Sequence, residues 1–344
     1  RRSEGFVNQK IREAKKKTRE KERQAMKIFH MLYGAAGVLL AAATVLTGDY
    51  GLSKTDMEIY DRAVGIEDAM AENGFCDFSP SDYKIRFFNG SCDYVVTEGE
   101  VAKEDAAFGT FVGTAYEIDG EYQVILPTYE NFSELFTMLN SVQSVSDGEM
   151  HFGEANYSED AHAATLWHEA FHAWQLKNWA DEVFARGEAA DISEEGGYER
   201  IVVNEVDSDS EYVLSFSQEM ELLQKAYESD DTEEKCRLTR EALALAVEME
   251  QGMSAQAAYV TQYFQTLEGS ARYVEAQAYR LLAGEEAWSE TYMGDFNYSN
   301  GAGKYYAMGM LKCLLIDQLT PEWKDDFTAT ADLDEFLQAA VGGR

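Results

Sequence analysis

The chain has 344 residues, of which 45% are hydrophobic, and a formal net charge of −34. This length can bury a sizeable core, in one large domain or two smaller ones. So large an excess of acidic residues argues against nucleic acid as a partner.

The first 27 residues are basic, with eleven Lys or Arg against four Glu, a net charge of +7 that leaves −41 on the rest. Residues 28–47 contain no charged side chain. Twenty helical residues span about 30 Å, enough to cross a bilayer. The positive-inside rule then predicts a cytoplasmic arm at 1–27, one transmembrane helix at 28–47 and an extracytoplasmic body at 48–344. A cleaved signal peptide and a buried soluble helix are the alternatives.

The first part of the body, about residues 55–187, mixes helical and strand patterns. Asn89-Gly90 and Asp119-Gly120 are typical of hairpin turns between strands. We therefore expect a small antiparallel sheet flanked by helices. The predicted helices cover 55–73 and 131–139, and the predicted strands cover 83–88, 93–96, 109–116 and 122–126.

A helix predicted to begin after Ser158 carries His168-Glu169-Ala170-Phe171-His172, which reads H-E-x-x-H. The two histidines are one turn apart and face the same way. They can share one Zn²⁺, and Glu169 would lie where it can take a proton from water on the metal. Only five histidines occur, so chance would give this pattern in roughly one such chain in a hundred. A core helix with two buried histidines is the alternative.

The rest of the chain, about residues 188–344, is predicted to be almost wholly helical. Loops are expected at 191–198 and 284–303. The predicted helices cover 211–227, 232–250, 255–282, 304–319 and 332–341. The fold class expected is therefore α+β, mostly α.

A catalytic zinc needs a third protein ligand, and two acidic residues are candidates. Glu268 is followed by Gly269 and Ala271, small residues that would let another backbone approach closely. Glu205 lies in an acidic stretch at 204–209. We favour Glu268 and keep Glu205 as the alternative.

The order H-E-x-x-H and then E-G-x-A-x-Y-x-E, at 168–172 and 268–275, resembles the gluzincin metallopeptidases, which include thermolysin and the aminopeptidase-N-like enzymes. The resemblance implies a zincin-like catalytic domain with His168, His172 and Glu268 as zinc ligands. Residues 204–209 resemble the N-E-x-x-x-D stretch of thermolysin-like enzymes, which would make Glu205 the ligand and Asp209 a supporting residue.

Peptide hydrolysis also needs a donor for the developing oxyanion. Many gluzincins use Tyr or His, and Tyr306 is our first candidate and Tyr305 our second; two core aromatic residues are the alternative. His151 is a weaker candidate, and His162 is expected to be structural. The four cysteines permit the disulfides Cys76–Cys92 and Cys236–Cys313, or four reduced thiols.

The function predicted is a membrane-anchored zinc metallopeptidase acting on a peptide or protein substrate, with Glu169 as general base. One alternative is a non-catalytic anchored binding module with a structural zinc. Another is a zinc hydrolase acting on non-peptide substrates. A structural zinc has no need of Glu169, so its presence favours an enzyme.

Overall fold

The computed structural model describes residues 52–73, 75, 78–109, 112–135, 157–190, 201–294, 302–328 and 330–342. The basic arm and the membrane helix predicted at 28–47 lie outside these residues, as do Cys76, His151 and the loop predicted at 191–198. Within the described ranges, no helix is long and apolar enough to cross a membrane.

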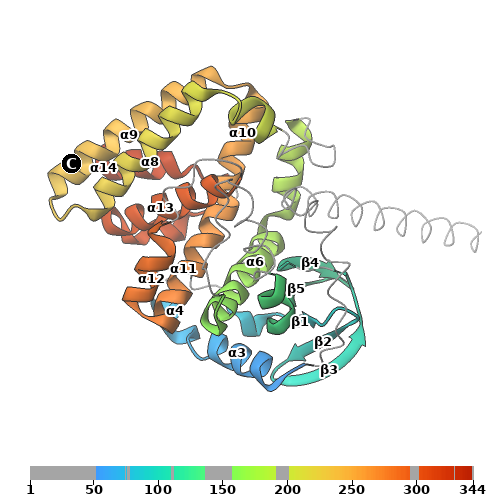
Figure 1. The fold of residues 1–344 in the computed structure, drawn as a ribbon. Helices are drawn as coiled ribbons and strands as arrows, with labels where there is room; N and C mark the ends of the chain where they lie inside the picture. The colour runs from blue at the N-terminus through green and yellow to red at the C-terminus, as the bar shows by residue number, and fades with distance from the viewer. Residues whose placement is uncertain are drawn as a thin grey trace, which may run out of the picture.

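The described chain is mostly helical, with one small sheet, as predicted (Figure 1). The long helix α6 (Glu159–Ala189) lies at the centre, in green. The sheet and α3 (Lys54–Val64) pack on one side of it, and the C-terminal helices, through α11 (Gly269–Ala283), pack on the other. The predicted catalytic helix is therefore covered from both sides.

The sheet has five strands in the order β3-β2-β1-β5-β4. The antiparallel sheet that we predicted is wrong in one pairing, because β1 runs parallel to β5, with Ile85 opposite Val124. Hydrophobic alternation predicts which side chains face the core, but not strand direction. The strands are β1 (Ile85–Phe88), β2 (Cys92–Thr97), β3 (Glu100–Asp105), β4 (Thr114–Ile118) and β5 (Glu121–Pro127).

Strand β3 was not predicted, since its sequence, EVAKED, is charged and every residue of it is exposed. The two predicted hairpins, β1–β2 and β4–β5, are confirmed. Asp119 and Gly120 both have positive φ, 53° and 86°, as a two-residue turn of type I′ requires.

The sheet's two faces differ in chemistry. Ile85, Phe87, Val124 and Leu126 are fully buried in the core cluster that includes α6. On the other face, the buried Arg86 donates to Gln123 (2.6 Å), Asp93 (3.2 Å) and Glu104 (2.7 Å). A buried guanidinium is tolerated there because each nitrogen has an acceptor.

Two predicted helices are divided. The helix expected over 55–73 is α3 and then α4 (Glu67–Asn73), and the one expected over 255–282 is interrupted by the π-helical turn η3 (Phe264–Glu268). The loop predicted at 284–303 is wrong in its first part, which forms α12 (Glu285–Tyr292). The other helices are α8 (Ser210–Glu228), α9 (Thr232–Gly252), α10 (Ala255–Tyr263), α13 (Gly303–Leu319) and α14 (Leu333–Gly342), with short turns η1 (Pro80–Asp82), η2 (Val202–Val206) and η5 (Pro321–Asp326).

Helices α11 and α13 approach closely at two glycines. A Cβ at Gly269 would lie 2.5 Å from Gly309 Cα, and one at Gly309 would lie 2.2 Å from the carbonyl oxygen of Gln265. We expected Gly269 to admit another backbone, and α13 is that backbone. The contact fixes η3, which ends in Glu268.

Cys92, Cys236 and Cys313 are buried free thiols. The Cys236–Cys313 disulfide is therefore not formed. Cys92 donates from Sγ to Asn89 Oδ1 at 3.4 Å.

Candidate metal centre

Helix α6 places His168, Glu169 and His172 in the interior. It begins as predicted at Ser158, whose hydroxyl accepts from the backbone N–H of Ala161 at 3.1 Å. Glu159 and Asp160 follow in the first turn, where the helix dipole favours acidic side chains. His168, Glu169 and His172 are all buried.

The structure brings Glu268 to these two histidines. Its Oε2 lies 3.3 Å from His172 Nε2 and 3.8 Å from His168 Nε2, and the two Nε2 atoms are 3.0 Å apart. Ligands about 2.1 Å from a tetrahedral zinc lie about 3.4 Å from one another. The three groups therefore stand at the separation that one metal ion would require, although one hundred residues of sequence separate His168 from Glu268.

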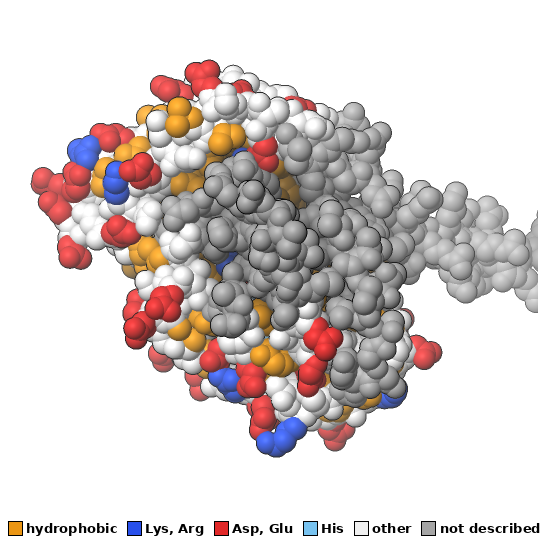
Figure 2. All heavy atoms as spheres, in the orientation of Figure 1, with side chains coloured by type: hydrophobic (Ala, Val, Ile, Leu, Met, Phe, Trp, Pro, Cys, Tyr) orange, Lys and Arg blue, Asp and Glu red, His pale blue; other side chains and the backbone are white. Residues whose placement is uncertain are grey.

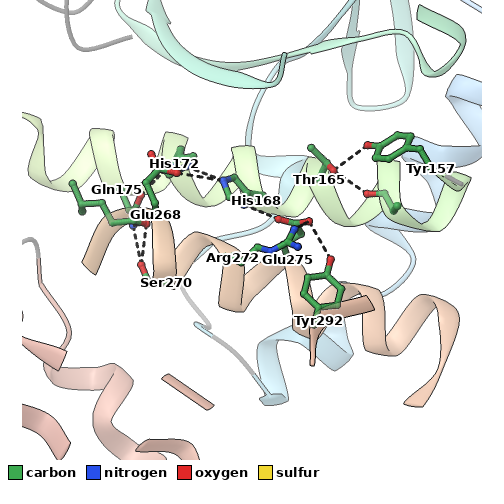
Figure 3. A network of polar contacts seen from close by, with 12 residues as sticks. Tyr157, Thr165, His168, His172, Gln175, Glu268, Ser270, Arg272, Glu275 and Tyr292 are labelled. Atoms are coloured by element: carbon green, nitrogen blue, oxygen red, sulfur yellow. Dashed lines mark hydrogen bonds and ion pairs between the residues drawn. The ribbon is translucent and has the colours of Figure 1, made fainter. Parts of the chain in front are cut away.

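The hydrogen bonds of the imidazoles favour metal binding through Nε2. His168 Nδ1 lies 2.9 Å from Glu275 Oε2, and His172 Nδ1 lies 2.7 Å from Gln175 Oε1 (Figure 3). Both partners are acceptors, so each Nδ1 carries the proton of a neutral ring. Two Nε2 lone pairs and a carboxylate then converge on one point, an arrangement that a cation stabilises.

The electrostatics of the pocket also call for positive charge. Burial opposes ionisation of all these groups, yet the carboxylates of Glu268 and Glu275 raise the pKa of His168 to about 10. The histidines lower the pKa of Glu268 to about 2 against the effect of burial. These shifts oppose the neutral state of the rings, so protons would compete with a metal ion for the two Nε2 atoms.

Gln175 connects α6 to the ligand-bearing turn. Its Nε2 donates to the carbonyl of Leu267 and to Ser270 Oγ, both at 3.1 Å. Its Oε1 meanwhile accepts from His172. One side chain thus orients an imidazole and ties it to the segment that carries Glu268 (Figure 3).

Glu275 is held from its other side. Its Oε1 accepts from Arg272 Nη1 at 2.5 Å and from the Tyr292 hydroxyl at 3.0 Å, and the Arg272 guanidinium stacks over the Tyr292 ring at 4.5 Å. Burial would raise the pKa of Glu275, but Arg272, His168 and Tyr292 together lower it to about 2. Glu275 is therefore an anion that orients His168, as carboxylates commonly do for metal-binding histidines.

Glu169 is oriented differently from the three candidate ligands. It is 4% exposed, and its Oε2 makes no hydrogen bond with any described residue. Burial raises its pKa to about 7, although His168 and His172 oppose the rise. The chain before β4 passes close by, since a Cβ at Gly113 would lie 2.5 Å from Glu169 Oε1. A carboxylate with a free oxygen and a pKa near neutrality suits a general base.

The alternative ligand Glu205 lies elsewhere. It is exposed in η2 and accepts from Ser254 Oγ at 2.6 Å. Asp209 accepts from the backbone N–H groups of Glu211 and Tyr212, at 2.9 and 3.2 Å, and so caps α8. Neither residue joins the histidines, and the cluster contains Glu268 instead.

The two tyrosines proposed as oxyanion donors lie at the start of α13. Tyr305 is fully buried, shares a hydrogen bond with the Tyr212 hydroxyl (3.1 Å) and stacks on Phe264. These contacts favour a packing role, because an oxyanion donor must face the substrate. Tyr306 is half-buried and packs against Phe264, four residues before Glu268.

His162 is fully buried and has Tyr157 OH 3.1 Å from its Nδ1. Burial lowers its pKa to about 3, so it stays neutral. This agrees with the structural role expected for it.

Four supporting residues were missed in the sequence. Glu275 stands seven positions after Glu268, two helical turns on, so the spacing placed both on one face. Gln175 stands three positions after His172, so helical spacing also placed these two residues on one face. No sequence pattern indicated a role for Arg272 or Tyr292, since Tyr292 belongs to the unpredicted helix α12.

Glu275→Ala is expected to lower metal affinity about 10–100-fold, the usual effect of losing a carboxylate behind a histidine ligand. Competition with a chromogenic chelator would measure this. Glu205→Ala is the matched control and should leave affinity unchanged. Equal affinity in the two variants would remove Glu275 from the site.

Comparison with known proteins identified no relative of this chain. No family model, no curated protein and no solved structure matches it. Its function is therefore inferred from the chemistry of its own residues.

Proposed function

We propose that this protein is a zinc-dependent metallopeptidase whose metal is held by His168, His172 and Glu268. The observation that carries the proposal is the convergence of two imidazole Nε2 atoms and one carboxylate, next to Glu169, whose Oε2 has no hydrogen-bond partner among the described residues. Two imidazoles and one carboxylate form a common catalytic zinc set, which leaves a coordination position open. Imidazole also suits copper, iron and nickel, so metal analysis belongs in the test.

A zinc ion in this site would supply Lewis acidity and make a water molecule acidic near neutral pH. Glu169 then takes the proton of the attacking water and passes it to the leaving amine. Glu169 is buried, and the low dielectric around it increases the effect of nearby charges on both proton transfers. Glu275 and Gln175 hold the imidazoles in the required orientation.

Tyr306 is the proposed donor to the oxyanion, with Tyr305 second. The phenol of Tyr305 is already shared with Tyr212, which favours Tyr306. In this proposal the hydroxyl of Tyr306 donates to the carbonyl oxygen as negative charge develops on it.

The substrate that we propose is a peptide or protein. Acidic side chains prevail on the visible described surface, where few Lys or Arg appear (Figure 2). A strongly acidic surface raises the local concentration of cationic peptides and speeds their association at low ionic strength.

The test combines metal analysis with cleavage of a peptide library. The purified full chain should bind about one zinc per molecule. Removal of the metal by a chelator should abolish cleavage, and added zinc should restore it. His172→Ala should lose both metal and cleavage. A full complement of zinc in that variant would refute the ligand set, and a zinc-loaded protein that cleaves no peptide would favour the structural-zinc or non-peptide alternatives.

We further propose that residues 28–47 anchor the enzyme in a membrane, with the acidic body outside the cytoplasm. The support is the uncharged run between a basic arm and an acidic body. Protease added to intact cells should digest the body and spare residues 1–27. Protection of the body would place it inside the cell.

A further inference from the structure

A cavity of ≈ 80 Å³ is lined by residues of α8, α9, α10, α13 and α14. One ordered water needs roughly 10–15 Å³ by the same measure, so a small organic molecule can enter. One wall of the cavity is η3, through Gln265 and Thr266. The cavity therefore borders the turn that carries Glu268, but it contains none of the three candidate metal ligands.

A buried charge cluster lies at the wall of this cavity. Lys312, 1% exposed, reaches Glu219 Oε1 at 3.0 Å and Asp334 Oδ1 at 2.6 Å. Its ammonium also donates to Gln265 Oε1 at 2.8 Å. Two carboxylates are thus ion-paired with this one ammonium, which donates a hydrogen bond to Gln265. The positive charge of Lys312 is therefore already balanced within the cluster.

Glu219 retains acceptor capacity. It is 3% exposed, lines the cavity, and has its Oε1 3.0 Å from Lys312 Nζ. A carboxylate has about four acceptor positions, so Glu219 can also accept from an occupant of the cavity. Burial raises the pKa of Glu219, although Lys312 lowers it in part.

The charge of the lining favours a cation. Glu250, Asp332 and Asp334 line the cavity together with Glu219, so its lining contains four acidic residues and one lysine. The acidic residues of this cavity do not form a set of three ligand atoms close enough to hold a bare metal ion. Among the described residues, such a set, with its atoms within 4.8 Å of one another, is found only at His168, His172 and Glu268. A cation that supplies its own N–H donors needs no such close set.

Apolar side chains complete the lining. Met249, Met253 and Leu333 stand beside the carboxylates. Methionine adapts its shape to varied ligands, because its side chain is unbranched and flexible. The cavity thus offers an acidic contact to a charged head and an apolar contact to a short chain.

We propose that this cavity binds a small organic cation, with a primary ammonium head at Glu219 and a short alkyl chain against Met249 and Met253. The proposal does not depend on the metallopeptidase assignment. The occupant would contact Gln265 and Thr266, in the same π-helical turn that presents Glu268.

The test uses n-butylammonium as the probe and 1-butanol as its neutral counterpart, each titrated calorimetrically into the full chain. One molecule of n-butylammonium should bind per chain, about tenfold or more tightly than 1-butanol, because only the cation pairs with a buried carboxylate. Equal affinity for the two compounds, or no saturable binding of the cation, would overturn the proposal.

Two variants locate the probe. Glu219→Gln should weaken n-butylammonium binding about tenfold or more, since it removes the charge and leaves Asp334 to balance Lys312. Met253→Trp should block the cavity without altering the charge cluster. Glu248→Gln, on the exposed face of α9, is the control and should bind as the unaltered chain does. Unchanged binding in Met253→Trp would place the probe elsewhere, whether or not Glu219→Gln folds.

Discussion

Replacing Glu169 by Gln is expected to leave zinc bound and to lower peptide hydrolysis about 10²–10⁴-fold, the usual contribution of a general base. Glutamine keeps the shape of the side chain but cannot accept the proton of the attacking water. Zinc should remain, because Glu169 is not among the three converging ligand groups. The measurements are kcat on the best library peptide and zinc content, on the same preparation.

Glu182→Gln is the matched control. It makes the same chemical change on the same helix, at an exposed position. Its activity should equal that of the unaltered chain. Full activity in Glu169→Gln would end the catalytic assignment of α6, whereas loss of zinc in that variant would show that Glu169 binds the metal.

Gly309→Ala is expected to destabilise the fold strongly, although it adds only one methyl group. The new Cβ would lie 2.2 Å from the carbonyl oxygen of Gln265 and 2.8 Å from Gly269 Cα, both backbone atoms. Neither can rotate away, so α11 and α13 must separate. Overpacking commonly costs about 1–3 kcal/mol, and a clash with backbone should reach about 3 kcal/mol or more.

Urea denaturation would measure the loss, with Gly252→Ala as control. Gly252 is in α9, and a Cβ there meets nothing within 4 Å, so its effect should stay within about 0.5 kcal/mol. Zinc affinity should also fall in Gly309→Ala, because Gln265 lies in the same turn as Glu268. Identical urea midpoints for the two variants would mean that the helices can move apart at no cost.

The sequence predicted the site better than it predicted the sheet. Helical periodicity of 3.6 residues was enough to place His168, Glu169 and His172 relative to one another, because all three lie within about one turn of the same helix. Glu268 could be chosen over Glu205 because small neighbours admit a second backbone. The direction of β1 against β5 depends on the path of the chain between them, which no local pattern encodes.

The missed elements have two different physical causes. Strand β3 is exposed on both faces, so its sequence has no alternation to detect. The turn η3 arises where α13 presses against α11 at Gly309, a contact between segments about forty residues apart. Tertiary packing of this kind overrides local helix periodicity.

The bonds of Gln175 bear on how the proposed metal site would be filled. Its amide joins His172 to Leu267 and Ser270 through protein atoms alone. The imidazole and the Glu268 segment are thus held together before an ion arrives, and little conformational entropy is left for metal binding to remove. This distinguishes the chain from small zinc domains that are unfolded until loaded. If the proposed zinc site is correct, the protein should fold before it is loaded, and its activity in the cell would then be set by zinc supply rather than by the folding reaction.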